Sequence, residues 1–116
     1  MGDVDAARAF ALSLPGSSEE PHFDMSSFRV NKKIFATVTS DETRLHVFVD
    51  ESEISASVAE DPAAFEPLLW GKAVRGVRVV LARAPEDRVR ELLAEAWLRK
   101  ASKRLVAEYE ARQKQT

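Results

Sequence analysis

The chain has 116 residues, of which 45% are hydrophobic and 31% are charged, and its formal net charge at pH 7 is −2. This globular composition excludes a disordered chain, a collagen and a coiled-coil rod, and the length favours one domain with a radius of gyration of about 13–14 Å. The absence of cysteine excludes disulfides and thiolate metal sites, no apolar run approaches the ~20 residues of a membrane span, and no signal-peptide pattern precedes Leu12. We therefore expect a cytoplasmic protein without a membrane partner.

The first elements alternate between apolar and polar stretches. Apolar side chains recur every three or four positions over residues 3–14, which predicts a helix that Asp3 caps and Pro15-Gly16 ends. Residues 17–26 are polar, and we expect a loop there.

A period of two begins at Phe28 and predicts three short antiparallel strands, over residues 28–30, 33–39 and 45–49. Asn31-Lys32 suits a tight turn between the first two, because asparagine tolerates a positive φ. In the second strand, Ile34, Ala36 and Val38 are expected on one face.

A short helix is predicted from Asp50, whose carboxylate lies three residues before Glu53, close to the spacing of a capping box. Residues 68–70 suit an edge strand after Pro67, Gly71 and Gly76 are expected to bracket a turn, and residues 77–81 alternate as a strand.

Two helical segments close the chain. Pro85 suits the first turn of an amphipathic helix whose apolar stripe ends at Trp97, and Ser102 is a candidate cap for a further segment. Strands grouped between helices indicate an α+β fold with a single antiparallel sheet and helices packed on one face.

The net charge conceals a basic region in the second half of the chain. Residues 68–85 contain Lys72, Arg75, Arg78 and Arg83 and no acid, whereas residues 50–67 contain six acids and no base. Further bases lie in the first hairpin and near the end of the chain: Arg29, Lys32, Lys33, Lys100, Lys103 and Arg104. If both hairpins lie at one end of the sheet, these side chains form a surface suited to phosphates. The alternative is that they are solvated or pair with the acidic helix over residues 50–61.

No constellation in the sequence indicates catalysis, and we expect neither an enzyme nor a cofactor. His22 and His46 are the only histidines, and neither has the second cluster of ligands that a metal site needs. There is no Gly-x-Ser-x-Gly elbow and no glycine-rich phosphate loop. Trp97 falls on an apolar helical stripe, whereas Trp70 stands beside the basic segment, where it either packs at the sheet edge or stacks on a base or another ligand.

The chain resembles the MmcQ/YjbR family in the order and spacing of several short motifs over about residues 5–106. These are Leu14-Pro15-Gly16, Glu20 with His22-Phe23, Ser27-Phe28-Arg29-Val30, Lys33-Ile34-Phe35-Ala36-Thr37, Glu60-Asp61-Pro62, Phe65-Glu66-Pro67, Trp70-Gly71, Ala96-Trp97 and Ala101-Ser102-Lys103-Arg104-Leu105. Ser102 replaces the usual proline of the last motif, so the final two helical segments could run together. Val77 stands where an aromatic often follows Gly76, and about ten residues extend beyond the usual end.

The resemblance implies one domain over residues 1–116, with a core at about 3–106, a helical extension at 107–116 and a CyaY-like (frataxin-like) architecture. It also implies binding of double-stranded DNA through two β-hairpin wings, at Arg29–Lys33 and Lys72–Arg83. The expected DNA-binding residues are Arg29, Lys32, Lys33, Lys72, Arg75, Arg78, Lys103 and Arg104.

Two alternatives remain open. One is a small-molecule or protein-binding module with a pocket near the His22–Ser27 loop, using His22, Phe23 and Trp70. The other is a frataxin-like iron role on an acidic ridge, for which Asp50, Glu51, Glu53, Glu60 and Asp61 are the candidates. We expect a monomer in each case.

Overall fold

Four helices and six strands follow one another along residues 4–114, the part of the chain that the computed structural model describes. In chain order they are α1 (Val4–Ser13), β1 (Ser18–His22), β2 (Met25–Val30), β3 (Lys33–Val38), β4 (Arg44–Val47), α2 (Glu51–Glu60), β5 (Phe65–Trp70), β6 (Ala73–Val80), α3 (Glu86–Lys100) and α4 (Lys103–Lys114).

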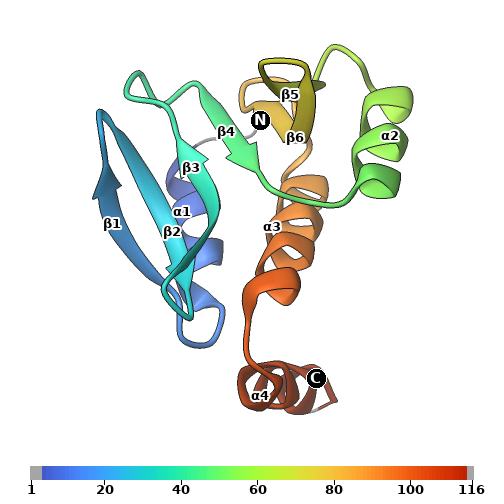
Figure 1. Cartoon of the computed structure of the whole chain (residues 1–116). Helices are drawn as coiled ribbons and strands as arrows, with labels where there is room; N and C mark the ends of the chain where they lie inside the picture. Colours follow the sequence, from blue (N-terminus) through green and yellow to red (C-terminus); the bar gives the residue numbers. More distant parts are fainter. Residues whose placement is uncertain (1–3, 115–116) are drawn as a thin grey trace.

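The strands form a single sheet in the order β1-β2-β3-β4-β6-β5, and every neighbouring pair is antiparallel. Helices α1, α2 and α3 cover one face of the sheet, while the other face is open and looks toward the viewer in Figure 1. The radius of gyration is 13.5 Å, within the range expected from the length. The predicted α+β class, with one antiparallel sheet and helices on one face, is confirmed.

Apolar side chains from alternate positions of the central strands meet α3 in the core. Leu45 and Val47 of β4 lie opposite Val79 and Val77 of β6, so all four point to the helical face, and none is exposed. Trp97 of α3 is also fully buried.

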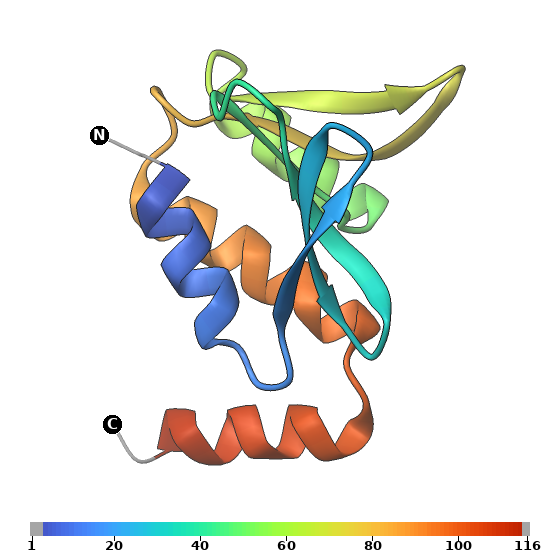
Figure 2. The same ribbon diagram turned by 90° about the vertical axis from the view of Figure 1, so that its left-hand side faces the viewer.

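Helix α4 packs across the ends of α1 and α3 (Figure 2). The indole Nε1 of Trp97 donates a hydrogen bond of 3.0 Å to the carbonyl oxygen of Pro15, just after α1. The ring of Tyr109 in α4 lies 5.2 Å from that of Trp97. Two connections between distant parts of the chain therefore meet at one buried side chain.

A β-bulge in the β2–β3 hairpin corrects the prediction for Ile34. The register pairs Phe28 with Ala36 but Arg29 with Ile34, so Phe35 is the extra residue on β3. Phe35 and Ala36 are both fully buried, and Ile34 is moved to the open face. The turn of this hairpin is as predicted, with positive φ at Asn31 and Lys32.

The predicted loop over residues 17–26 is wrong, because strand β1 and the start of β2 occupy it. As an edge strand, β1 has only one neighbour and is mostly exposed, so its residues carry no apolar alternation. Glu19 fixes it to α1 by accepting two hydrogen bonds from Nε of Arg8, at 3.0 and 3.1 Å.

The β5–β6 hairpin is longer than expected. Gly71 and Lys72 form its turn, but Gly76 lies inside β6, so the expectation that the two glycines bracket the turn is wrong. A Cβ atom at Gly76 would collide with the carbonyl oxygen of Val47. Only glycine lets β6 approach β4 this closely before the hairpin projects from the sheet.

Polar caps set several helix ends. The carboxylate of Asp50 accepts a 3.0 Å hydrogen bond from the amide of Glu53, which confirms the predicted start of α2. Asp3, the predicted cap of α1, lies outside the described residues. The last two helical segments do not run together, because Ala101 is extended (φ −72°, ψ 152°) and Ser102 caps a separate helix through the amide of Leu105.

Candidate nucleic-acid interface

One row of side chains crosses the open face from edge to edge. Residues in register on antiparallel neighbours point to the same face, and the six strands each contribute one residue to this row. They are Glu20, Ser27, Thr37, His46, Arg78 and Glu66. The row therefore places polar groups on the side that the helices leave uncovered.

The two hairpins flank this face. In Figure 2 their turns lie at the upper and lower right, on the side of the sheet away from α1. Lys32 lies in the turn of the β2–β3 hairpin, with Lys33 directly after it, and Lys72 lies in the β5–β6 turn. All three are exposed.

Three arginines extend the basic surface between the turns. Nε of Arg29 donates to the hydroxyl of Ser27 at 2.9 Å, which holds Arg29 against the open face. Arg78 is in register with His46 in the row across the sheet. The guanidinium of Arg75 lies 5.9 Å from the ring centroid of Trp70, within range of a cation–π interaction.

Ion pairing differs between the two sides of the molecule. On the helical side, Arg8, Arg88, Arg90 and Arg112 all form ion pairs with carboxylates. Between residues 4 and 114, by contrast, none of the eight expected DNA-binding residues lies within 4.0 Å of a carboxylate oxygen, and six of them belong to the open face or its hairpins, the exceptions being Lys103 and Arg104 of α4. The bases of the open face and its hairpins thus keep their charge available.

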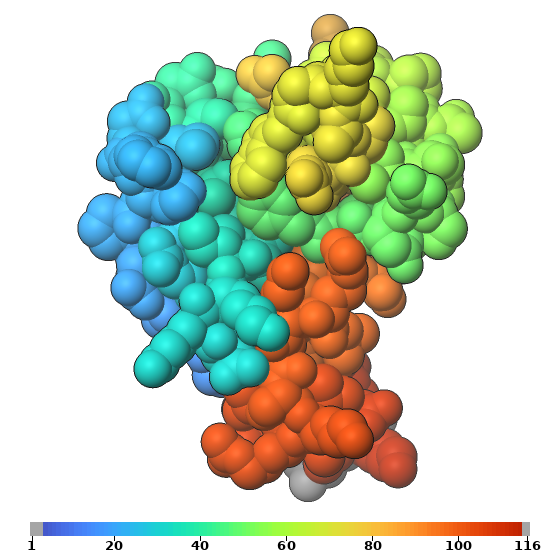
Figure 3. All heavy atoms as spheres, viewed as in Figure 1, coloured from blue at the N-terminus to red at the C-terminus, as the bar shows by residue number. Residues whose placement is uncertain are grey.

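A pocket of about 360 Å³ lies at the centre of the open face. Atoms of β3, the β5–β6 hairpin and the end of α3 surround this centre in Figure 3. The lining contains three cationic side chains and no carboxylate: His22, Met25, Ile34, Thr37, His46, Phe48, Trp70, Arg75, Arg99 and Lys100.

The aromatic part of this pocket is exposed and held in place. Trp70 is 60% exposed, and its ring stands edge-to-face against Phe48 with 6.0 Å between centroids. The guanidinium of Arg99 donates a 2.9 Å hydrogen bond to the carbonyl oxygen of Phe48, which holds the end of α3 beside this pair of rings. A flat side chain is therefore fixed next to positive charge.

The floor of the pocket contains two unused polar atoms. Thr37 is only 3% exposed, and neither its hydroxyl nor Nε2 of His46 has a hydrogen-bond partner among the described residues. Burial lowers the pKa of His46 below its ordinary value of 6.5, and the charge of Arg78 lowers it further. His46 is thus neutral at pH 7.

Some of the site residues predicted from the sequence lie together in the central pocket, and others lie elsewhere. His22, Trp70 and Arg75 line the same pocket, although His22 is far from the other two in sequence. Phe23 does not line it: its φ is +58° in the β1–β2 turn and the residue is 91% exposed. Lys103 and Arg104 lie in the first turn of α4, below the sheet.

Several lining residues were missed as site residues. Lys100 was named among the bases near the end of the chain but not as part of a pocket, whereas Arg99, the exposed base before it at the end of α3, was missed. Thr37 and Phe48 carried no signal of a site, because each looked like one more residue of an alternating strand.

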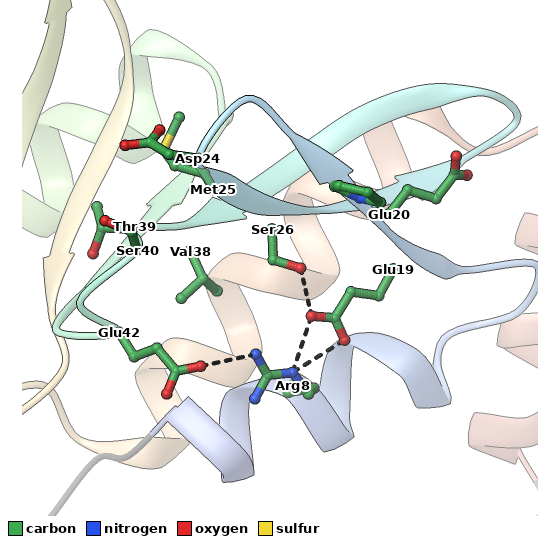
Figure 4. A pocket seen from close by; sticks show the side chains of 11 residues that line it. Arg8, Glu19, Glu20, Asp24, Met25, Ser26, Val38, Thr39, Ser40 and Glu42 are labelled. Carbon is green, nitrogen blue, oxygen red and sulfur yellow. Dashed lines mark hydrogen bonds and ion pairs between the residues drawn. The ribbon is translucent and has the colours of Figure 1, made fainter.

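A second pocket, also of about 360 Å³, lies near the His22–Ser27 loop, on the side of α1. Figure 4 shows Arg8 within it, bonded to Glu19 and Glu42. Ser26 donates its hydroxyl to the same Glu19 carboxylate. Most charged side chains of this second pocket thus already bond one another and hold β1 and the β3–β4 turn against α1. This pocket is therefore a weaker candidate for a ligand site.

The acidic ridge considered for iron shows no convergence. In the described part of the chain, no three His, Asp or Glu side chains gather as a metal site would require. Glu53 and Glu60 instead pair with Arg88 of α3, at 3.5 and 3.2 Å.

No helix within residues 4–114 is long and apolar enough to cross a membrane.

The fold is thus that of an α+β domain with two hairpins beside an open sheet face, and comparison with known proteins identifies its family. The YjbR family model matches residues 12–99, so the chain belongs to the YjbR family. The crystal structure of Deinococcus radiodurans protein DR2400, described as containing a DUF419 domain, superposes with a TM-score of 0.73 and 25% identity. The match covers 84% of this chain and 78% of that one. Among curated proteins, no relative matches.

Proposed function

We propose that the chain binds DNA through the open face of the sheet, with the β2–β3 and β5–β6 hairpins as its two contact points. The observation that carries the proposal is that, within the described residues, no base of the open face or its two hairpins forms an ion pair with a carboxylate. A lysine or arginine that already pairs with a carboxylate gains little binding free energy from a phosphate. An unpaired lysine or arginine that neutralises a phosphate displaces counterions from the DNA, which favours binding.

Contacts of this kind position a duplex without reading its sequence. Lysines in hairpin turns are long and mobile, and they suit phosphate oxygens better than base edges. We therefore expect weak sequence preference and strong salt dependence, and the proposal includes no catalytic step.

Fluorescence anisotropy with a labelled duplex at low salt tests the proposal. The slope of log K against log salt should become less negative by about 1.8 in the double variant Lys32→Gln/Lys72→Gln, which removes one charge from each turn. The matched control, Arg90→Gln/Lys114→Gln, removes the same charge from α3 and α4 and should leave the slope nearly unchanged. Absence of binding at tens of micromolar protein, or equal effects of the two double variants, would reject the proposal.

A further inference from the structure

We propose that the central pocket of the open face binds a single nucleotide, with its base against Trp70 and its phosphate among Arg75, Arg99 and Lys100. The inference goes beyond the proposed function, because duplex DNA keeps its bases stacked and paired and would offer only phosphates to this face. It also rests on pocket side chains and not on the lysines of the hairpin turns.

The charge of the pocket selects an anion. Three cationic side chains line it and no carboxylate does, although the protein as a whole is slightly acidic. Arg75 and Arg99 are each fixed by one contact, to the Trp70 ring and to the Phe48 carbonyl oxygen. Guanidinium donors not used in those contacts remain for phosphate oxygens.

The aromatic wall selects a flat ligand. Trp70 is 60% exposed beside two further exposed apolar side chains, Leu69 and Val74, and a contiguous patch of this kind marks an interaction site; the Phe48 ring braces the indole from one side. Bases stack on such side chains whatever their identity, and basic grooves with aromatic platforms are the usual means of holding unpaired nucleotides.

The floor of the pocket selects a ligand with hydrogen-bonding groups on its edge. Thr37 is almost completely buried, its hydroxyl is unpartnered, and Nε2 of His46 in the adjacent strand is unpartnered as well. Buried polar atoms without partners are rare and unfavourable. Both atoms are covered in the free protein, so a base edge that hydrogen-bonds them must first displace the lining side chains over them; a volume of about 360 Å³ is within the range of pockets for small ligands.

A nucleotide of this chemistry comes either free or as an unpaired position in a single strand. The experiment measures binding of adenosine 5′-monophosphate, adenosine, inorganic phosphate and single-stranded dA10 by calorimetry and by quenching of Trp70 fluorescence. We expect the monophosphate or dA10 to bind more tightly than adenosine and phosphate. Binding of the free monophosphate identifies a small-molecule site, whereas binding of dA10 alone identifies an unpaired strand position, and both outcomes support the proposal.

Three variants test the roles of individual side chains. Trp70→Ala should weaken binding at least about fivefold, which corresponds to the lower limit for one stacked base. Thr37→Val keeps the shape of a side chain whose hydroxyl bonds nothing in the protein, so it should fold normally and bind about threefold more weakly or worse. Leu69→Ala removes an exposed neighbour of Trp70 that lies outside the pocket lining and should bind normally.

Calorimetry is the deciding measurement for the Trp70 variant, because the only tryptophan left in that variant is the buried Trp97, which does not line the pocket. The proposal is overturned if phosphate alone binds as tightly as the monophosphate, or if neither nucleotide form binds at millimolar concentration. It is also overturned if Leu69→Ala weakens binding as much as Trp70→Ala does. The duplex titration is scored separately: nucleotide binding without duplex binding rejects the proposed function and leaves the pocket assignment standing.

Discussion

Replacing Trp97 by phenylalanine tests whether the end of α3 is held by one buried side chain. The indole is fully buried, and its Nε1 donates to the Pro15 carbonyl oxygen at 3.0 Å. Phenylalanine lacks the pyrrole part of the ring, which costs roughly 2 kcal/mol at about 0.8 kcal/mol per buried carbon. It also leaves the buried carbonyl of Pro15 without a donor, which costs at least about 1 kcal/mol. We therefore expect Trp97→Phe to lower the free energy of unfolding by about 3 kcal/mol.

Urea denaturation measures this loss. With a slope of about 1.5 kcal/mol per molar urea, typical of a domain of this size, the midpoint should fall by about 2 M. The control is Tyr109→Phe, because that ring also packs in the cluster but its hydroxyl makes no hydrogen bond in the described residues; it should change stability by less than about 0.5 kcal/mol. A midpoint shift under 0.5 M for Trp97→Phe, at an unchanged slope, would refute the reasoning.

Three further predictions concern the sheet and its turns. Gly76→Ala should cost about 2 kcal/mol or more in thermal unfolding, because its Cβ meets the Val47 carbonyl, whereas Gly71→Ala, with open space around it, should cost about 1 kcal/mol for its positive φ alone. Hydrogen bonds from Thr39 and Thr43 lower the pKa of Asp41 to about 2, so the NMR titration of its carboxyl should have that midpoint. The resulting stabilisation is complete above the ordinary value of 3.8 and is lost as the pH falls toward 2, a dependence that Asp41→Asn should abolish. In an NMR titration the pKa of His46 should lie below 6.5, and Arg78→Gln should raise that pKa part of the way back. Because the folded state lowers this pKa, the contribution of His46 to stability is complete above pH 6.5 and declines as the pH falls below that value.

The elements that were predicted from the sequence are those with one buried and one exposed side. The apolar stripe of α3 and the apolar alternation in β4 and β6 were visible in the sequence, because an element with core on one side and solvent on the other repeats its apolar residues at a fixed spacing. Strand β1 could not be found this way, because an edge strand with two exposed sides carries no such period. Ile34 was assigned to the wrong face because a bulge shifts the alternation by one residue, and nothing at Phe35 marks it.

The candidate site was predictable only in part, for a related reason. Free bases in hairpins leave a signal, namely a stretch without acids, and Arg75 and Lys72 were found from it. Thr37 and His46 are brought together by strand pairing between β3 and β4, a relation that depends on the register and not on local sequence. That their polar atoms lack partners is visible only once every neighbouring element is in place.

Both outer strands of the sheet contain a proline, Pro21 in β1 and Pro67 in β5. Proline has no N–H to offer a further strand, and the glutamates at positions 20 and 66 beside them add repulsion between identical chains. The rims of the sheet are therefore poor templates for fibril growth. The exposed lysines of the two hairpins therefore lie on a sheet whose edges do not invite pairing with another copy of the chain.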